Sequence, residues 1–303
     1  MSASKKGGDE RRTIEELQTR YLLEPRLGDI YVEGWFDVGV VSWFLGAHRR
    51  NWKVYPIDSV DVPAQQVLAG GLDDGARGRV ITLGRALEPT LKDADVKPMC
   101  IADRDFDALQ QPPSRQNDIC LFTDFKSMEL YSYDLKAIDK LLKLFLHVRD
   151  LAADEVINAL TPALVDLGLL RAVLHGNGHN IALLNNVKRC CNNSGGTVRL
   201  DMRELLRRSI DEAGKRVPGR LRPNADIILA EVDALRRTMT SDIRLAIHED
   251  DFVQLLAWYL EPHVRGSEYH RTEVVRRALM SCLESADLAQ YPLFAEILKR
   301  TAA

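Results

Sequence analysis

The sequence lacks the cysteine arrangements that are typical of zinc sites and disulfide-bonded proteins. Its five cysteines form no Cys-x-x-Cys pair, and the adjacent Cys190 and Cys191 do not have zinc-finger spacing. Cys100 and Cys120 lie inside apolar runs, where cysteine usually acts as a small buried hydrophobe. We therefore expect reduced thiols and a cytoplasmic protein.

Long apolar runs and a strong net charge are also missing. No run approaches the roughly 18 apolar residues that span a bilayer, so we expect no membrane association. Residues 1–12 are polar and charged, without the apolar segment of a secretory signal, and we expect a disordered tail over residues 1–20. A net charge of -3 excludes a general basic surface for nucleic acid but is compatible with a local basic groove.

Short β-prone runs alternate with helical segments in the first half of the chain. The expected strands cover residues 29–32, 52–57, 96–102 and 118–122, and the expected helices cover residues 13–23, 35–47 and 80–94. Thr13, with Glu16 three residues on, is a candidate cap for the first of these helices. This alternation is typical of βαβ units, so we predict an α/β fold with a mostly parallel sheet flanked by helices. The Trp and Phe residues of 35–44 lie on a mostly apolar helix, and we expect them in the core.

From about residue 134 the apolar residues recur at helical spacing, and strand signals are nearly absent. The expected helices cover residues 135–145, 152–160, 181–187, 202–213, 226–239, 252–260 and 274–285. We therefore divide the chain after its tail into an α/β domain, residues 21–150, and an α-helical domain, residues 151–303.

Acidic residues follow two of the expected strands. Glu33 comes directly after one strand, and Asp103, Asp105 and Asp107 alternate directly after another. Reactive groups in parallel sheets lie at the carboxyl ends of the strands. Alternate carboxylates in an extended segment share a face and repel each other unless a cation compensates them, and Mg²⁺ prefers such oxygen ligands. We predict a Mg²⁺ site here, with Mn²⁺ as a second possible ion; a solvated acidic turn is the alternative.

Further charged residues follow the strand expected over 118–122. Glu129 has apolar neighbours, among which an unpaired carboxylate is costly, so it is a candidate metal ligand. Lys126 is a candidate point charge for a phosphate. Asp124 either completes the metal shell or caps a short helix. Asp37 is more typical of a first helical turn, where the helix dipole favours negative charge.

Together these motifs resemble those of TOPRIM-like nucleases. They are Val32-Glu33-Gly34 with Asp37, Asp103-Arg104-Asp105-Phe106-Asp107, Thr123-Asp124 with Glu129, and Gly178-His179. Their order and spacing, over residues 28–190, are similar to those of an uncharacterised TOPRIM-like family of bacterial proteins. One member of that family is the nuclease subunit of the PARIS anti-phage system, which works with an ABC-type ATPase partner.

The resemblance implies a Mg²⁺-dependent endonuclease in which Glu33 is the general base or a metal ligand and Asp103 and Asp105 bind Mg²⁺. It implies a nucleic acid substrate, either RNA such as tRNA or DNA, and an effector role in defence under the control of an ATPase. We further expect a homo-oligomer. The sequence shows neither the tyrosine domain of a topoisomerase nor the zinc module of a primase. A non-catalytic sensor or assembly module of an ATPase complex is the alternative, and nucleotidyl transfer is a third hypothesis.

Two further groups of polar residues are candidates for function. His175 and His179 lie at a glycine-containing turn ahead of the helix expected over 181–187; a structural role is favoured over metal binding. Arg203, Arg207 and Arg208 are candidates for contact with a nucleic acid backbone, although interleaved acidic residues favour an ordinary solvated helix.

Overall fold

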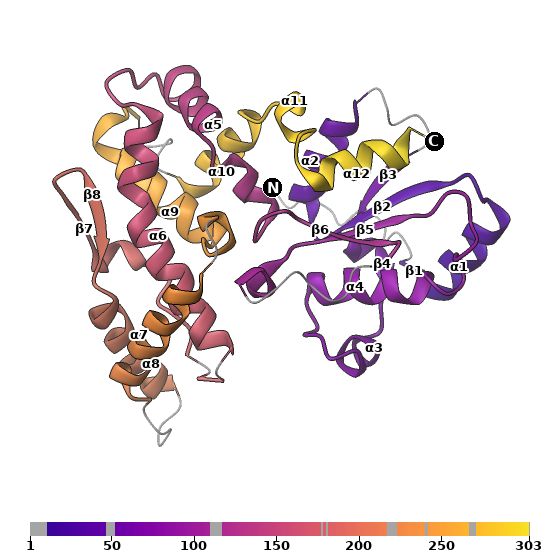
Figure 1. The fold of residues 1–303 in the computed structure, drawn as a ribbon, viewed down its shortest axis with the longest axis horizontal. Helices are drawn as coiled ribbons and strands as arrows, with labels where there is room; N and C mark the ends of the chain where they lie inside the picture. The colour runs from indigo at the N-terminus through magenta and orange to yellow at the C-terminus, as the bar shows by residue number, and fades with distance from the viewer. Residues whose placement is uncertain are drawn as a thin grey trace, which may run out of the picture. The chain divides into compact units, whose positions relative to one another are not determined.

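The computed structural model describes most of the chain and divides it into two compact units (Figure 1). The described residues are 11–46, 52–109, 117–176, 178–179, 181–216, 223–239, 242–266 and 271–302, without the side chains of 107 and 108. The first unit comprises Met1–Arg104, Pro113–Asp124 and Glu284–Ala303, and the second comprises Asp105–Pro112 and Phe125–Leu283. This division differs from the expected boundary at residue 150, because the chain leaves the first unit earlier and returns to it at its carboxyl end.

A parallel sheet of four strands in the order β3-β2-β5-β6 forms the centre of the first unit, which confirms the predicted α/β fold. The strands are β2 (Gly28–Val32), β3 (Trp52–Pro56), β5 (Met99–Ala102) and β6 (Cys120–Phe122). A separate parallel pair joins β1 (Arg12–Thr13) to β4 (Val60–Asp61). Every residue of β2 and β5 is buried, as expected for central strands that helices cover on both faces.

Helices cover both faces of this sheet. The helices of this unit are α1 (Ile14–Leu23), α2 (Trp35–Leu45), α3 (Ala64–Ala69), α4 (Ala76–Leu87), α11 (Ser285–Leu288) and α12 (Pro292–Thr301), with a 3-10 turn at Ile57–Ser59. In Figure 1, α4 runs below the strands and α12 above them. Tyr21 of α1, Ile81 of α4 and Cys120 of β6 belong to one buried apolar cluster, so the main core of this unit lies between these helices and the sheet.

The start of α1 is fixed by the predicted capping pair. Thr13 Oγ1 accepts the N–H of Glu16 at 3.2 Å, and Glu16 Oε2 accepts the N–H of Thr13 at 2.8 Å, so two otherwise unsatisfied donors are bonded. The tail expected over residues 1–20 is therefore wrong from residue 12 onward, where β1 and α1 begin. Residues 1–10 lie outside the described part of the chain.

The aromatic residues of α2 do not all enter the core. Phe44 is buried and packs edge-on against Phe294 of α12, with 4.7 Å between the ring centroids. Trp35 is 75% exposed and Trp43 is 48% exposed, so the expectation of a core position is wrong for both tryptophans. They are eight residues apart, which places them on the same side of the helix.

The second unit is mostly helical, as predicted. Its α-helices are α5 (Leu135–Lys140), α6 (Ala153–Gly176), α7 (Met202–Arg216), α8 (Ala225–Thr238), α9 (Glu249–Leu260) and α10 (Thr272–Ser281). A π-helix at Leu141–Phe145 and 3-10 turns at Asp105–Leu109, Met128–Ser132, Val187–Cys190, Ile243–Leu245 and Glu261–His263 complete it. By length and composition α6 is apolar enough to cross a membrane, but 61% of its most apolar window is buried within the protein, so this is weak evidence.

The segment after α6 differs from its prediction. Residues 181–186 form no helix, and a hairpin of β7 (Cys191–Ser194) and β8 (Thr197–Leu200) follows, so the helix expected over 181–187 is wrong. The hairpin turns at Gly195 and Gly196, whose φ angles are 61° and 76°. A two-residue turn of this kind needs positive φ at both positions, which glycine adopts without strain.

A substitution at Gly168 can test how closely α6 packs against the backbone of Ala246. A Cβ atom added there would lie 1.8 Å from the carbonyl oxygen of Ala246, so backbone would have to move. We expect Gly168→Ala to lower the free energy of unfolding by roughly 1–3 kcal/mol despite the better helix propensity of alanine. The measurement is urea unfolding of the full chain.

Gly176→Ala, on the same helix, is the matched control, because among the described residues no atom lies within 4 Å of the added Cβ. We expect the free energy of unfolding of this variant to differ from that of wild type by no more than about 0.5 kcal/mol. Equal midpoints for the two variants would contradict the close packing at Gly168.

Candidate active site

The structure brings together two of the predicted metal ligands. β2 and β5 are neighbouring parallel strands, paired at Ile30 with Met99 and at Tyr31 with Cys100, so they end at the same edge of the sheet. There Glu33 Oε1 accepts the N–H of Asp103 at 2.8 Å. Both side chains are partly exposed. Glu33 and Asp103 therefore form the centre of the candidate site.

The backbone at Asp103 is held from two sides. Arg77, in the first turn of α4, donates from Nε to the Asp103 carbonyl at 2.8 Å and from Nη2 to the Arg104 carbonyl at 3.3 Å. The N–H of Arg104 donates to Thr123 Oγ1 at 3.1 Å. Hydrogen bonds to a cationic donor are stronger than neutral ones, so the turn after β5 is fixed in position.

The Asp-x-Asp segment is not extended, contrary to the expectation that its carboxylates alternate along one strand face. β5 ends at Ala102, and Asp105 begins a 3-10 turn with φ of 51°, in the left-handed region. Asp105 is also the first residue of the second unit. The side chain of Asp107 lies outside the described part of the structure, so its predicted role as a ligand stays a prediction.

Lys126 lies in the second unit and is only 2% exposed. Its Nζ is 3.9 Å from Asp105 Oδ1 and 3.9 Å from the centre of the Phe106 ring, and burial lowers the pKa of its ammonium group. The N–H of Asp105 donates to the Lys126 carbonyl at 2.9 Å. An ammonium in this position stabilises the 3-10 turn at Asp105 rather than presenting an exposed charge to a phosphate.

Glu129, the other predicted ligand, has a protein cation as its partner. Arg276 of α10 donates from Nη1 to Glu129 Oε1 at 2.7 Å, and the Glu129 side chain is 13% exposed. The same guanidinium also pairs with Asp250. The charge that a metal was expected to compensate is thus compensated by an arginine 147 residues further along the chain.

Asp124 and Asp37 act at helix starts. Asp124 accepts the N–H of Leu293 at 3.2 Å, in the first turn of α12, so it caps a helix 169 residues away rather than the short helix that follows it in sequence. Asp37 accepts the N–H of Gly34 at 3.1 Å at the start of α2, as its predicted helix-start role requires. Both interactions satisfy amide donors that the helix itself leaves unbonded.

The histidines and arginines singled out in the sequence have partners within the second unit. His175 stacks on Phe106 at 4.9 Å, and His179 Nε2 lies 3.0 Å from Glu231 Oε2. The arginine contacts are Arg203 to Asp226 at 2.7 Å, Arg207 to Glu204 at 2.8 Å and Arg208 to Glu204 at 2.6 Å. These ion pairs favour the solvated-helix interpretation over a nucleic acid surface, and their hydrogen bonds lower the pKa of Glu204 to about 2.

A group that the sequence did not single out gathers at the start of α9. Ligand atoms of His248, Glu249 and Asp250 lie within 4.8 Å of one another. His248 Nδ1 accepts the N–H of Asp250 at 3.3 Å, and Asp250 pairs with Arg276, so the group caps its helix and is already engaged. Burial lowers the pKa of His248 to about 2 and raises the pKa of Glu249 to about 7.

No protein-family model matches this chain, and no curated protein matches its sequence significantly. The TOPRIM resemblance therefore depends on the motifs described above. Between these motifs, the structure joins Asp103 to Glu33 and Arg104 to Thr123 by hydrogen bonds.

The pKa of Glu249 predicts a pH dependence of stability. Unfolded Glu249 loses its proton near pH 4.5, whereas the folded group keeps it until about pH 7, because burial disfavours the carboxylate. The native state binds more protons in this window, so stability falls as the pH rises through it. Glu249→Gln removes this loss, and we expect its stability relative to wild type to rise by up to roughly 3 kcal/mol between pH 4.5 and pH 7.

Denaturant unfolding of both proteins at pH 4.5 and pH 8 measures this difference. Glu296→Gln is a useful comparison, because hydrogen bonds from Arg300 lower the pKa of that carboxyl group. The stability of Glu296→Gln relative to wild type should therefore not rise between pH 4.5 and pH 8. A constant difference between Glu249→Gln and wild type at the two pH values would contradict the perturbed carboxyl group.

Proposed function

We propose that the protein is a Mg²⁺-dependent nuclease that hydrolyses phosphodiester bonds of RNA or DNA, with Glu33 and Asp103 as its metal-binding pair. The observation that carries this proposal is the hydrogen bond from the Asp103 N–H to Glu33 Oε1. It joins two acidic residues 70 positions apart at the edge of the sheet where parallel α/β folds bind their ligands.

The donor set suits a hard divalent cation. Mg²⁺ prefers carboxylate oxygens and usually keeps several water molecules, so two partly exposed carboxylates are a suitable protein contribution. When bound, the ion supplies an activated water and compensates the charge on the leaving oxygen. Glu33 contributes as a ligand or general base, and Asp103 contributes as a ligand. Arg77 and Thr123 hold the turn that follows β5, because they bond to the backbone of Asp103 and Arg104.

Roles for Asp105 and Asp107 as further ligands remain part of the proposal. Asp105 has a left-handed backbone conformation, which is uncommon for residues other than glycine and is enriched at functional turns. Control by an ATPase partner and an effector role in anti-phage defence follow from the resemblance, and these two, together with homo-oligomer formation, stay predictions.

A non-catalytic sensor or assembly module is the second candidate function. It is favoured by the structural use of three neighbouring charged residues: Lys126 is buried, Asp124 caps α12, and Glu129 pairs with Arg276. Such a module would bind no Mn²⁺ in calorimetry and would co-purify with an ATPase. A primase-like enzyme would instead incorporate labelled nucleotides.

The test is cleavage of total tRNA, total RNA and plasmid DNA by the full chain with Mg²⁺ or with EDTA. We expect cleavage with Mg²⁺ only, and a loss of at least roughly 100-fold in Glu33→Gln, since this change removes the charge that binds the ion or accepts the proton. Calorimetry with Mn²⁺ should show binding to wild type and weaker binding to Glu33→Gln.

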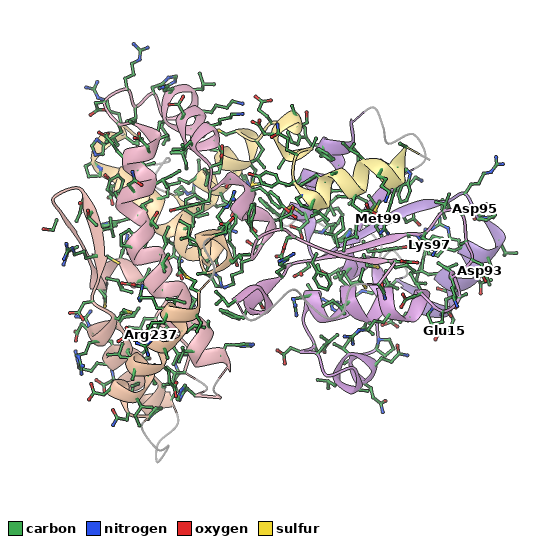
Figure 2. All side chains as sticks on the ribbon, in the orientation of Figure 1. Glu15, Asp93, Asp95, Lys97, Met99 and Arg237 are labelled. Atoms are coloured by element: carbon green, nitrogen blue, oxygen red, sulfur yellow. The ribbon has the colours of Figure 1, made fainter. Side chains whose placement is uncertain are left out.

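Asp118→Asn is the matched control. Asp118 precedes β6 and pairs with Lys97 at 3.0 Å, and its side chain is 75% exposed. Lys97 and Met99, labelled in Figure 2, mark the amino end of β5, which is the opposite edge of the sheet from Asp103. Asp118→Asn should cleave like wild type. Equal cleavage by Glu33→Gln and wild type would refute the assignment of Glu33.

A further inference from the structure

The first unit contains a pocket of about 540 Å³ at the carboxyl ends of β2 and β3. This volume lies within the roughly 300–1,000 Å³ that is usual for small-ligand sites. The residues that matter for its chemistry are Arg11, Arg12, Tyr31, Trp35, Tyr55 and Asp58. Aromatic and basic side chains thus dominate the lining.

Trp35 is the most exposed of the aromatic residues in this lining. It is 75% exposed, two positions after Glu33, and it opens α2. The backbone that carries it is held in place, because Gly34 precedes the helix in extended conformation and the Gly34 N–H donates to Asp37. Single exposed apolar residues are common, but this one is an aromatic ring at a pocket beside arginines, so its face is available for stacking.

Two tyrosines, Tyr31 and Tyr55, belong to the lining of the pocket. Tyr31 and Tyr55 stack with ring centroids 5.9 Å apart and an angle of 25° between the rings. Tyr31 is buried and its hydroxyl is engaged with the Tyr21 hydroxyl at 2.8 Å, so Tyr31 supports the Tyr55 ring rather than offering a group of its own to a ligand. The Arg12 guanidinium lies over the Tyr55 ring, 5.9 Å from its centre.

The charge of the lining is positive. Among the described residues of the lining, the one acidic side chain is Asp58, which pairs with Arg79 at 2.9 Å, and this compensates the carboxylate. Arg11 and Arg12 supply the remaining charge. Stacking surfaces beside arginines are the arrangement with which proteins hold unpaired bases and the phosphates next to them.

A pocket in the second unit has related residue types but a different arrangement. It is lined by Phe106, His175, Arg171 and His248, among others. The Phe106 ring already stacks on His175 and contacts Lys126 Nζ, and Arg171 forms two hydrogen bonds with Asp251. Its aromatic ring and its arginine are therefore engaged within the protein.

We infer that the pocket at Trp35 binds an unpaired nucleobase of a nucleic acid strand, with Trp35 as the stacking surface and Arg12 beside the adjacent phosphate. This inference rests on the proposed function for the role of the strand as substrate. It adds that single-stranded or locally unpaired nucleic acid, RNA or DNA, is the class that the site takes, because a base inside a duplex cannot reach a stacking ring in a pocket.

The test is binding of labelled oligonucleotides of about 12 nucleotides to the full chain in EDTA, measured by fluorescence anisotropy. The arms are single-stranded RNA, single-stranded DNA and the duplex of the same sequence. We expect Trp35→Ala to weaken single-strand binding by roughly 5- to 100-fold, the range for losing one base–aromatic stack. Trp35→Phe should retain most of the binding, because phenylalanine keeps a stacking ring.

Trp43→Ala is the matched control, since Trp43 lies on the same side of α2, is 48% exposed and is not part of the pocket. We expect it to bind like wild type. Equal binding by Trp35→Ala and wild type would overturn the inference. So would an equal loss in both variants, because that outcome points to the stability of α2 or to its whole exposed face rather than to stacking in the pocket.

Arg12→Gln gives a second readout. If Arg12 contacts one phosphate, the slope of log affinity against log salt concentration falls by about 0.7 in magnitude for single strands. An unchanged slope would overturn the assignment of Arg12.

Cleavage is measured separately, so the two proposals fail separately. Single-strand binding that needs Trp35, without cleavage that needs Mg²⁺ and Glu33, would refute the nuclease and support the base pocket. Cleavage that needs Glu33, with single-strand binding unaffected by Trp35→Ala, would refute the base pocket alone.

Discussion

The parallel pairing of β2 with β5 is the constraint on which the candidate site depends. Because these strands run in the same direction and are aligned at Tyr31 and Cys100, both end at one edge of the sheet, where Glu33 accepts the N–H of Asp103. A slip of one residue in this register would turn every side chain of a strand to the other face. It would also place the buried residues of β2 against the wrong helices. The same packing that buries the strands therefore sets the geometry of the two acidic residues.

Most of the first sheet could be predicted, because its signals are local. Apolar runs bounded by glycine or by charged residues indicated all four strands, and Thr13 with Glu16 indicated where α1 begins. The return of the carboxyl end to this unit could not be predicted in the same way. It depends on contacts such as Phe44 with Phe294 and Asp124 with the start of α12, which join residues that no sequence window contains together.

The site was harder to predict than the fold, because sequence shows that a charge needs a partner but does not identify the partner. Glu129 among apolar neighbours does need compensation, since a buried unpaired carboxylate is costly. The sequence pattern suggested a metal, whereas the structure supplies Arg276. Lys126 is similar: its ammonium faces Asp105 and the ring of Phe106, and its burial followed from packing that the motif does not show. The proximity of Glu33 and Asp103 was easier to predict, because the ends of neighbouring strands in a parallel sheet meet by topology.

The two tryptophans of α2 lie in different environments, which the apolar composition of the helix does not distinguish. A helix of eleven residues that packs on one side cannot bury every apolar side chain, and Val41, Phe44 and Leu45 already fill the buried side. Trp35 and Trp43 are exposed on the remaining side of the helix. They share that side because they are eight residues apart. The structure distinguishes them: Trp35 lines a basic, aromatic pocket and Trp43 does not. Because Trp35 follows Glu33 by two positions, the turn that places the acid at the sheet edge also places the ring at the pocket. Catalytic and binding groups of the proposed nuclease would therefore be positioned by the same short segment of chain.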